Sequence, residues 1–254
     1  TLALEGRPVW AVAVCTLAAT IKVPAIAAAI FVGFAWVRGV PDWRTRVTRC
    51  AKVSAVAVGV AAAVTIITGF GTGWISGALF ATPARVRLAI TPATDLSWTL
   101  ASLLRDVGAS VTFRGLESVV RVVAFAATVL VALALLRKTT TERIPQYLGL
   151  ALAAFALGGP AMWPWYLSWA LVLVAAWRPA QRSRALIAAV IIGSFLVKPD
   201  GILALPLGSS PIVAALWITA AALAWYAWTR KDQRFRRAEF KDGLGGTRSV
   251  LAEP

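Results

Sequence analysis

The chain has 254 residues, of which 59% are hydrophobic and 15% are charged, and it contains no histidine. This composition leaves too little polar surface for a water-exposed fold, so it excludes a soluble globular domain and predicts an all-α, polytopic membrane protein. The absence of histidine excludes His-based triads and His metal sites. The net charge of +15 comes from short basic clusters between apolar runs, which favours anionic membrane lipids over nucleic acid as their partner.

The first apolar run, residues 9–37, is longer than the roughly 20 residues that one membrane span needs. Lys22 and Pro24 lie at its middle. The run is therefore either one kinked helix or two shorter helices that meet at a turn near Lys22, because proline breaks the helical ladder. A lysine at membrane depth is costly enough to suggest a function, although it could also snorkel or occupy an interfacial turn.

Basic and nearly neutral connections alternate along the chain, and short basic connections resist translocation. This pattern predicts a multi-pass protein of the plasma membrane, with a transmembrane domain at 1–229 and a basic cytoplasmic tail at 230–254. The seven predicted spans cover residues 9–37, 53–69, 117–136, 146–158, 163–177, 185–197 and 211–229. The connections around Arg46, Lys138, Arg182 and Arg234 are predicted to be cytoplasmic, and those around Arg85, Gly159 and Asp200 to lie outside.

The segment between the second and third predicted spans, residues 69–116, is predicted to be a long extracytoplasmic loop that carries short interfacial helices. Arg85 and Arg87 follow Pro83 in this loop, and their guanidinium groups suit a phosphate ligand. Both could instead contact only lipid headgroups. Asp95 is the one outer carboxylate near this candidate anion site, so it is a weak candidate for catalysis, but it could equally cap a helix.

An aromatic cluster occupies residues 163–169, at the predicted outer end of a span. Aromatic residues at that depth commonly form only an interfacial belt. Flat rings can also stack on sugars or bracket a polyprenyl chain. Trp163, Trp165 and Tyr166 are therefore candidates for lining a sugar or polyprenyl path.

Three of these segments, residues 69–79, 82–87 and 163–167, together resemble the actinobacterial polyprenol-phosphate-mannose-dependent α-1,6-mannosyltransferases of lipomannan synthesis. Residues 19–24, Ala-Thr-Ile-Lys-Val-Pro, are similar to the lysine-bearing helix of membrane glycosyltransferases with the GT-C fold. The order of the motifs agrees over most of the chain. The resemblance therefore implies a GT-C-like helical bundle that forms the C-terminal portion of such an enzyme.

By this resemblance, the full protein would move mannose from a polyprenyl-phosphate donor to a lipid-linked, growing α-1,6-mannan at the outer face of the plasma membrane. Arg85, Arg87 and Lys22 would hold the donor phosphate. The family carries its catalytic aspartate in a first outer loop, which is expected upstream of Thr1, so this fragment is expected to be inactive alone. No residue is assigned to a metal and no cofactor is indicated, while a requirement for a divalent metal stays open.

Two other classes of function remain as alternatives. A transporter or lipid flippase would show paired broken helices in two related halves, whereas only one Lys-x-Pro break is present. A non-catalytic subunit of an envelope-assembly complex is the other alternative, and the elaborate outer loop weighs against it.

Overall fold

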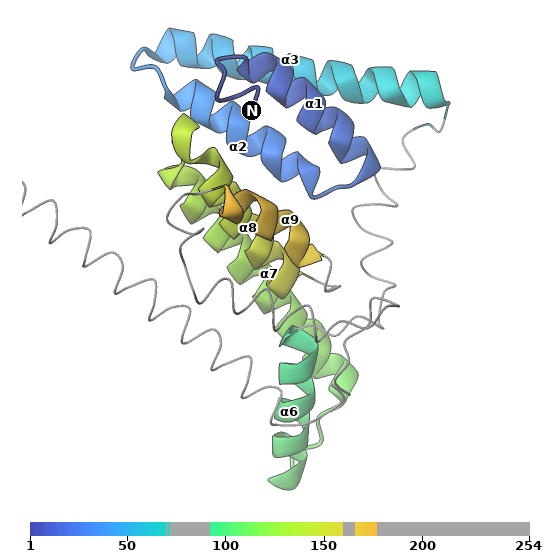
Figure 1. Ribbon diagram of the computed structural model, residues 1–254. Coiled ribbons are helices and arrows are strands. Elements are labelled where there is room, and N and C mark those ends of the chain that lie inside the picture. The colour runs from blue at the N-terminus through green and yellow to red at the C-terminus, as the bar shows by residue number, and fades with distance from the viewer. Residues whose placement is uncertain (70, 72–91, 160–165, 177–254) are drawn as a thin grey trace, which may run out of the picture. The chain divides into compact units, whose positions relative to one another are not determined.

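The computed structural model describes residues 1–69, 71, 92–159 and 166–176, and every regular element in these ranges is a helix (Figure 1). The expected all-helical class is therefore confirmed for the described residues. All of them belong to the first of the two units into which the chain divides, Thr1–Gly208. The predicted spans at 185–197 and 211–229 and the tail at 230–254 lie outside the described residues.

The first apolar run forms two helices rather than one, α1 (Pro8–Ile21) and α2 (Ala25–Arg38). They pack against each other as a hairpin, drawn in blue in Figure 1. Lys22 adopts an extended conformation after α1, and Pro24 precedes α2, where its missing N–H breaks no helical hydrogen bond. Small residues such as Ala29 and Ala35 line the buried side of α2, which allows the close packing typical of membrane helices.

Helix α3 (Trp43–Thr68) begins well before the predicted span at 53–69. The cause is Asp42, whose carboxylate accepts hydrogen bonds of 2.8 Å from the backbone N–H and from the hydroxyl of Thr45. These hydrogen bonds lower the pKa of Asp42 below its usual range. The basic residues that were predicted to lie in the connection before residue 53 therefore occupy the first turns of α3. The helix ends before Gly69, which adopts a left-handed conformation with φ 68°.

Helix α6 (Pro92–Asp106) lies within residues 69–116, the segment in which the sequence predicts short helices. Ala93, Ser97 and Ala101 are buried and recur every four residues, so they form one packed face. Helix α7 (Phe113–Lys138) follows and contacts α6. The rings of Trp98 and Phe113 stack with centroids 4.1 Å apart, which joins the two helices where the chain turns between them.

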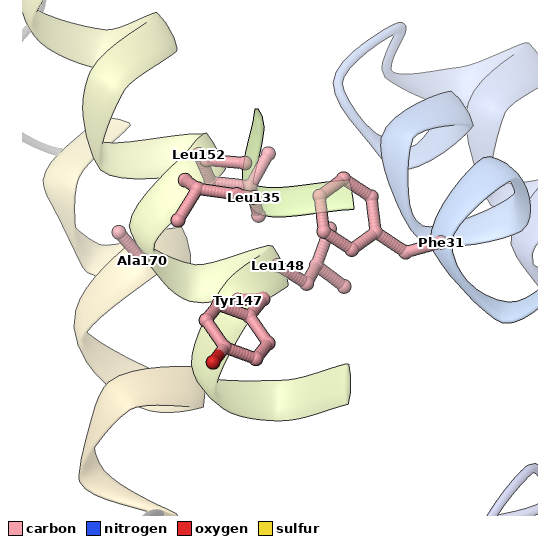
Figure 2. Close-up of a cluster of buried hydrophobic side chains, with 7 residues drawn as sticks. Phe31, Leu135, Tyr147, Leu148, Leu152 and Ala170 are labelled. Atoms are coloured by element: carbon pink, nitrogen blue, oxygen red, sulfur yellow. The ribbon is translucent and has the colours of Figure 1, made fainter. Parts of the chain in front are cut away.

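A short 3-10 turn, η2 (Thr141–Arg143), leads into α8 (Ile144–Gly158), and α9 (Tyr166–Ala175) packs on α8. Glycines set these close contacts: Gly158 lies against Thr128 of α7, and Gly149 lies against α9. In Figure 2, Phe31 of α2 points toward Leu148, and so joins the first hairpin to this group of helices. The buried cluster consists of Phe31, Leu135, Tyr147, Leu148, Ala151, Leu152 and Ala170.

Two of the described helices, α3 and α7, are long and apolar enough to cross a membrane. Few apolar side chains of α3 pack inside the protein: Val53, Val56 and Ala57 are partly buried against the cluster that contains Val12 and Val32. Ile66 and Ile67 are 79% and 82% exposed, and no residue of the helix is fully buried. A core helix of a soluble protein would bury this surface. The exposed apolar helices therefore support the assignment of the chain as a membrane protein.

Candidate functional site

Three side chains from two distant parts of the chain meet where the α1–α2 turn approaches the start of α9. The Nζ atom of Lys22 lies 5.6 Å from the ring centroid of Tyr166 and 5.9 Å from that of Trp169. The two aromatic rings are themselves stacked, with centroids 4.5 Å apart and an interplanar angle of 23°. Both contacts are within the range of a cation–π interaction. We call these three residues the lysine–aromatic cluster.

The backbone on both sides of Lys22 fixes the position of its side chain. Its N–H donates to the carbonyl of Ala18 at 2.9 Å, and its own carbonyl accepts from the N–H of Ala25 at 3.0 Å. Pro24 restricts the next turn through its fixed φ. The lysine is therefore held at a defined break between two helices, and the residue is exposed.

The aromatic pair is positioned by the packing of α9. Tyr166 and Trp169 are three residues apart on the helix, so their side chains project from the same side. Ala170 is buried in the cluster that contains Phe31, and Trp169 packs against that cluster. Gly149 of α8 allows α9 to pack closely against α8, because a Cβ atom at this position would lie only 3.1 Å from the Ala170 carbonyl oxygen. The same core thus holds both partners of the cation–π contacts.

The lysine–aromatic cluster offers an ammonium group that is not already neutralised. Among the described residues the one ion pair joins Arg121 and Glu117, so none involves Lys22. A cation–π contact at an exposed site contributes only about 0.5–1 kcal/mol, and an ammonium group carries three N–H donors. Lys22 can therefore bind an anionic oxygen while the adjacent rings present flat apolar faces to the rest of a ligand. Within the described ranges, no three acidic or cysteine side chains gather as metal ligands would.

The structure describes only part of the predicted site. The sequence predicts both Lys22 and Tyr166 as site residues, and the fold brings them together although 143 residues separate them in the chain. Trp169 belongs to the predicted aromatic cluster but was not selected, and its i, i+3 spacing from Tyr166 was the signal that could have identified it. Asp95 lies in α6, but its side chain is not among those described. Arg85, Arg87, Trp163 and Trp165 lie outside the described residues.

Comparison with known proteins gives two matches. The family described as MptB C-terminal domain matches residues 93–230, more than half of the chain. An alpha-(1→6)-mannopyranosyltransferase of Mycobacterium tuberculosis is 27% identical over 215 residues, which cover 78% of this chain. The chain spans only 36% of the length of that relative. No solved structure matches.

Proposed function

Because the chain belongs to the family of the MptB C-terminal domain, we propose that it is the C-terminal part of a membrane mannosyltransferase. The proposed reaction moves mannose from a polyprenyl-phosphate donor to a growing, lipid-linked α-1,6-mannan at the outer face of the plasma membrane. Family membership confirms the resemblance drawn from the motifs, and the name of the mycobacterial relative supports the sugar and the linkage. The lysine–aromatic cluster is the structural observation that carries the proposal.

The proposed role of Lys22 is to bind the donor phosphate. As the bond between the sugar and the phosphate breaks, negative charge accumulates on the leaving polyprenyl phosphate, and a positioned cation stabilises it. Each hydrogen bond to a charged group contributes about 1.5–3 kcal/mol, and each of the two cation–π contacts contributes roughly 0.5–1 kcal/mol, so two N–H donors on one phosphate outweigh both contacts. The ammonium group can therefore turn from the rings to the phosphate.

In this proposal Tyr166 and Trp169 offer their ring faces to the sugar or to the first part of the polyprenyl chain. Arg85 and Arg87 supply further phosphate contacts, and Trp163 and Trp165 extend the aromatic path. These roles require the predicted topology, in which the loop that carries Arg85 and Arg87 and the end of the span that carries Trp163 and Trp165 both lie at the outer face.

The test is to replace Lys22 in the longer enzyme that contains this chain and to measure mannosyl transfer from polyprenyl-phosphate-mannose to an α-1,6-mannoside acceptor. Lys22→Met keeps the length of the side chain and removes its charge. We expect kcat/KM to fall by about 10²–10³, the usual effect of losing one positioned donor to developing charge. Trp169→Leu should weaken donor binding without preventing membrane insertion.

Lys52→Met is the matched control, because Lys52 is likewise an exposed lysine but lies in α3, outside the lysine–aromatic cluster. It should leave transfer unchanged. Turnover of Lys22→Met within threefold of wild type, at equal expression and insertion, would show that Lys22 does not bind the donor phosphate.

A further inference from the structure

Arg121 is a second cation, separate from the lysine–aromatic cluster, that the proposed reaction does not use. It lies in α7, one helical turn after Glu117, and both residues fall within the predicted span at 117–136. Their side chains are only 17% and 16% exposed, and Arg121 Nε lies 3.4 Å from Glu117 Oε1. An ionisable residue inside a membrane span is costly to insert, and such residues commonly mark a binding site or pathway.

The guanidinium group of Arg121 is incompletely satisfied. Its Nε and Nη2 atoms are buried and have no hydrogen-bond partner among the described residues. The Glu117 carboxylate is close enough for an ion pair, but the contact is not a directed hydrogen bond. A guanidinium carries five N–H donors in a rigid fork, and a single carboxylate on its Nε side cannot pair them all. Because these donors are buried, a ligand with several acceptor oxygens would pair with them by displacing the groups that now cover them.

The position of Arg121 on α7 indicates where such a ligand would bind. Arg121 and Thr128 are seven residues apart, so they lie on one face of the helix and about 10 Å apart along its axis. The Thr128 hydroxyl lies beside the end of α8, 3.5 Å from the carbonyl oxygen of Ala154. Arg121 therefore projects from the side of α7 that faces α8, beyond the last turn of α8. In the predicted topology this is the outer half of the membrane.

We propose that Arg121 binds a lipid-borne phosphate group in the outer half of the membrane, with Glu117 orienting the guanidinium from its Nε side. Phosphate is the anion that best matches the arginine fork, because two of its oxygens can accept parallel N–H donors. Arg114, two turns earlier on α7, is exposed and is therefore the matched control for a buried arginine on the same helix. The phosphate could belong to a polyprenyl lipid or to a phospholipid. This site does not depend on mannosyl transfer, because its occupancy can be measured without turnover.

The experiment counts bound lipids by native mass spectrometry of the longer protein that contains this chain, purified and freed of endogenous lipid. The probes are farnesyl phosphate, the neutral alcohol farnesol, and phosphatidylglycerol. We compare wild type with Arg121→Gln, Arg121→Lys and the control Arg114→Gln. Arg121→Gln should bind one phosphate lipid fewer, or bind it about 10- to 100-fold more weakly, as expected from losing charged hydrogen bonds. Arg121→Lys should bind with intermediate affinity, because it keeps the charge without the fork.

Farnesol should bind equally to all variants, and Arg114→Gln should bind within threefold of wild type. Loss of farnesyl phosphate alone in Arg121→Gln would identify a polyprenyl ligand, and loss of phosphatidylglycerol alone would identify a phospholipid. Lys22→Gln is measured in parallel, so a failure of the proposed donor site is distinguished from a failure here. Unchanged stoichiometry and affinity for both phosphate lipids in Arg121→Gln and Arg121→Lys would overturn the proposal and leave Arg121 as a structural ion pair with Glu117.

Discussion

The crossing of α7 and α8 depends on the missing side chain of Gly158. A Cβ added to this glycine would overlap the Thr128 hydroxyl and would lie 3.3 Å from the Ala124 carbonyl oxygen. The Thr128 hydroxyl is not free to move aside without cost, because it donates to Ala124 O at 2.9 Å within a buried position. We therefore expect Gly158→Ala to destabilise the protein by about 1–3 kcal/mol through overpacking.

The clash can be relieved by a second substitution, which makes the prediction specific. Thr128→Ala alone should destabilise by roughly 1 kcal/mol through lost packing, since it removes a buried methyl group and a hydroxyl. Combined with Gly158→Ala, however, it removes the atom that the new methyl group meets. The double variant should thus be more stable than Gly158→Ala, with a coupling energy of about 1 kcal/mol or more in a double-mutant cycle.

Reversible unfolding in mixed detergent micelles, followed by tryptophan fluorescence, measures these free energies. Gly59→Ala in α3 is the matched control, because nothing lies within 4 Å of its added Cβ. It should be neutral or stabilise by up to about 1 kcal/mol, the gain in helix propensity from glycine to alanine. Additive effects of Gly158→Ala and Thr128→Ala, or a stable Gly158→Ala variant, would refute the close approach of α7 and α8.

Three further predictions concern the ends of the helices and the loops. Asp42 contributes stability above the ordinary pKa of its carboxyl, and this contribution is lost as the pH falls through the lowered pKa. Thermal melting at neutral pH should therefore show a lower Tm for Asp42→Ala and a Tm near that of wild type for Asp42→Asn. As the pH falls, the Tm of Asp42→Asn should decrease less than that of wild type. Identical dependence of Tm on pH for wild type and Asp42→Asn would contradict this prediction. If Arg85 or Arg87 binds the donor phosphate, its replacement by alanine should reduce the rate of mannosyl transfer by about 10²–10³. Near-normal turnover in both alanine variants would show that neither arginine binds the phosphate. In a cysteine-free background, a cysteine introduced at Gly159 should react with an impermeant reagent in intact cells and one at Arg46 should not; the opposite pattern would invert the topology.

The amino-acid sequence by itself determined the all-helical class of the protein. A hydrophobic content of 59% cannot be covered by polar surface in water, so exposed apolar helices follow from composition alone. Helices α7 and α8 begin and end close to the predicted spans, because apolar runs and the charged residues that flank them are local signals. The early start of α3 was missed, although its signal, Asp42 three residues before Thr45, is also local.

Tertiary structure alone decided how residues 9–37 are divided and which candidates meet. A proline in an apolar run is compatible with a kink or with a turn, and the packing of α1 on α2 and of Phe31 on the α7–α8 core makes it a turn. That turn brings Lys22 to Tyr166 and Trp169, a contact that no local pattern encodes, because it depends on how three separate helices pack. The unsatisfied guanidinium of Arg121 was equally invisible in the sequence, since burial and the loss of hydrogen-bond partners arise only when the helices assemble.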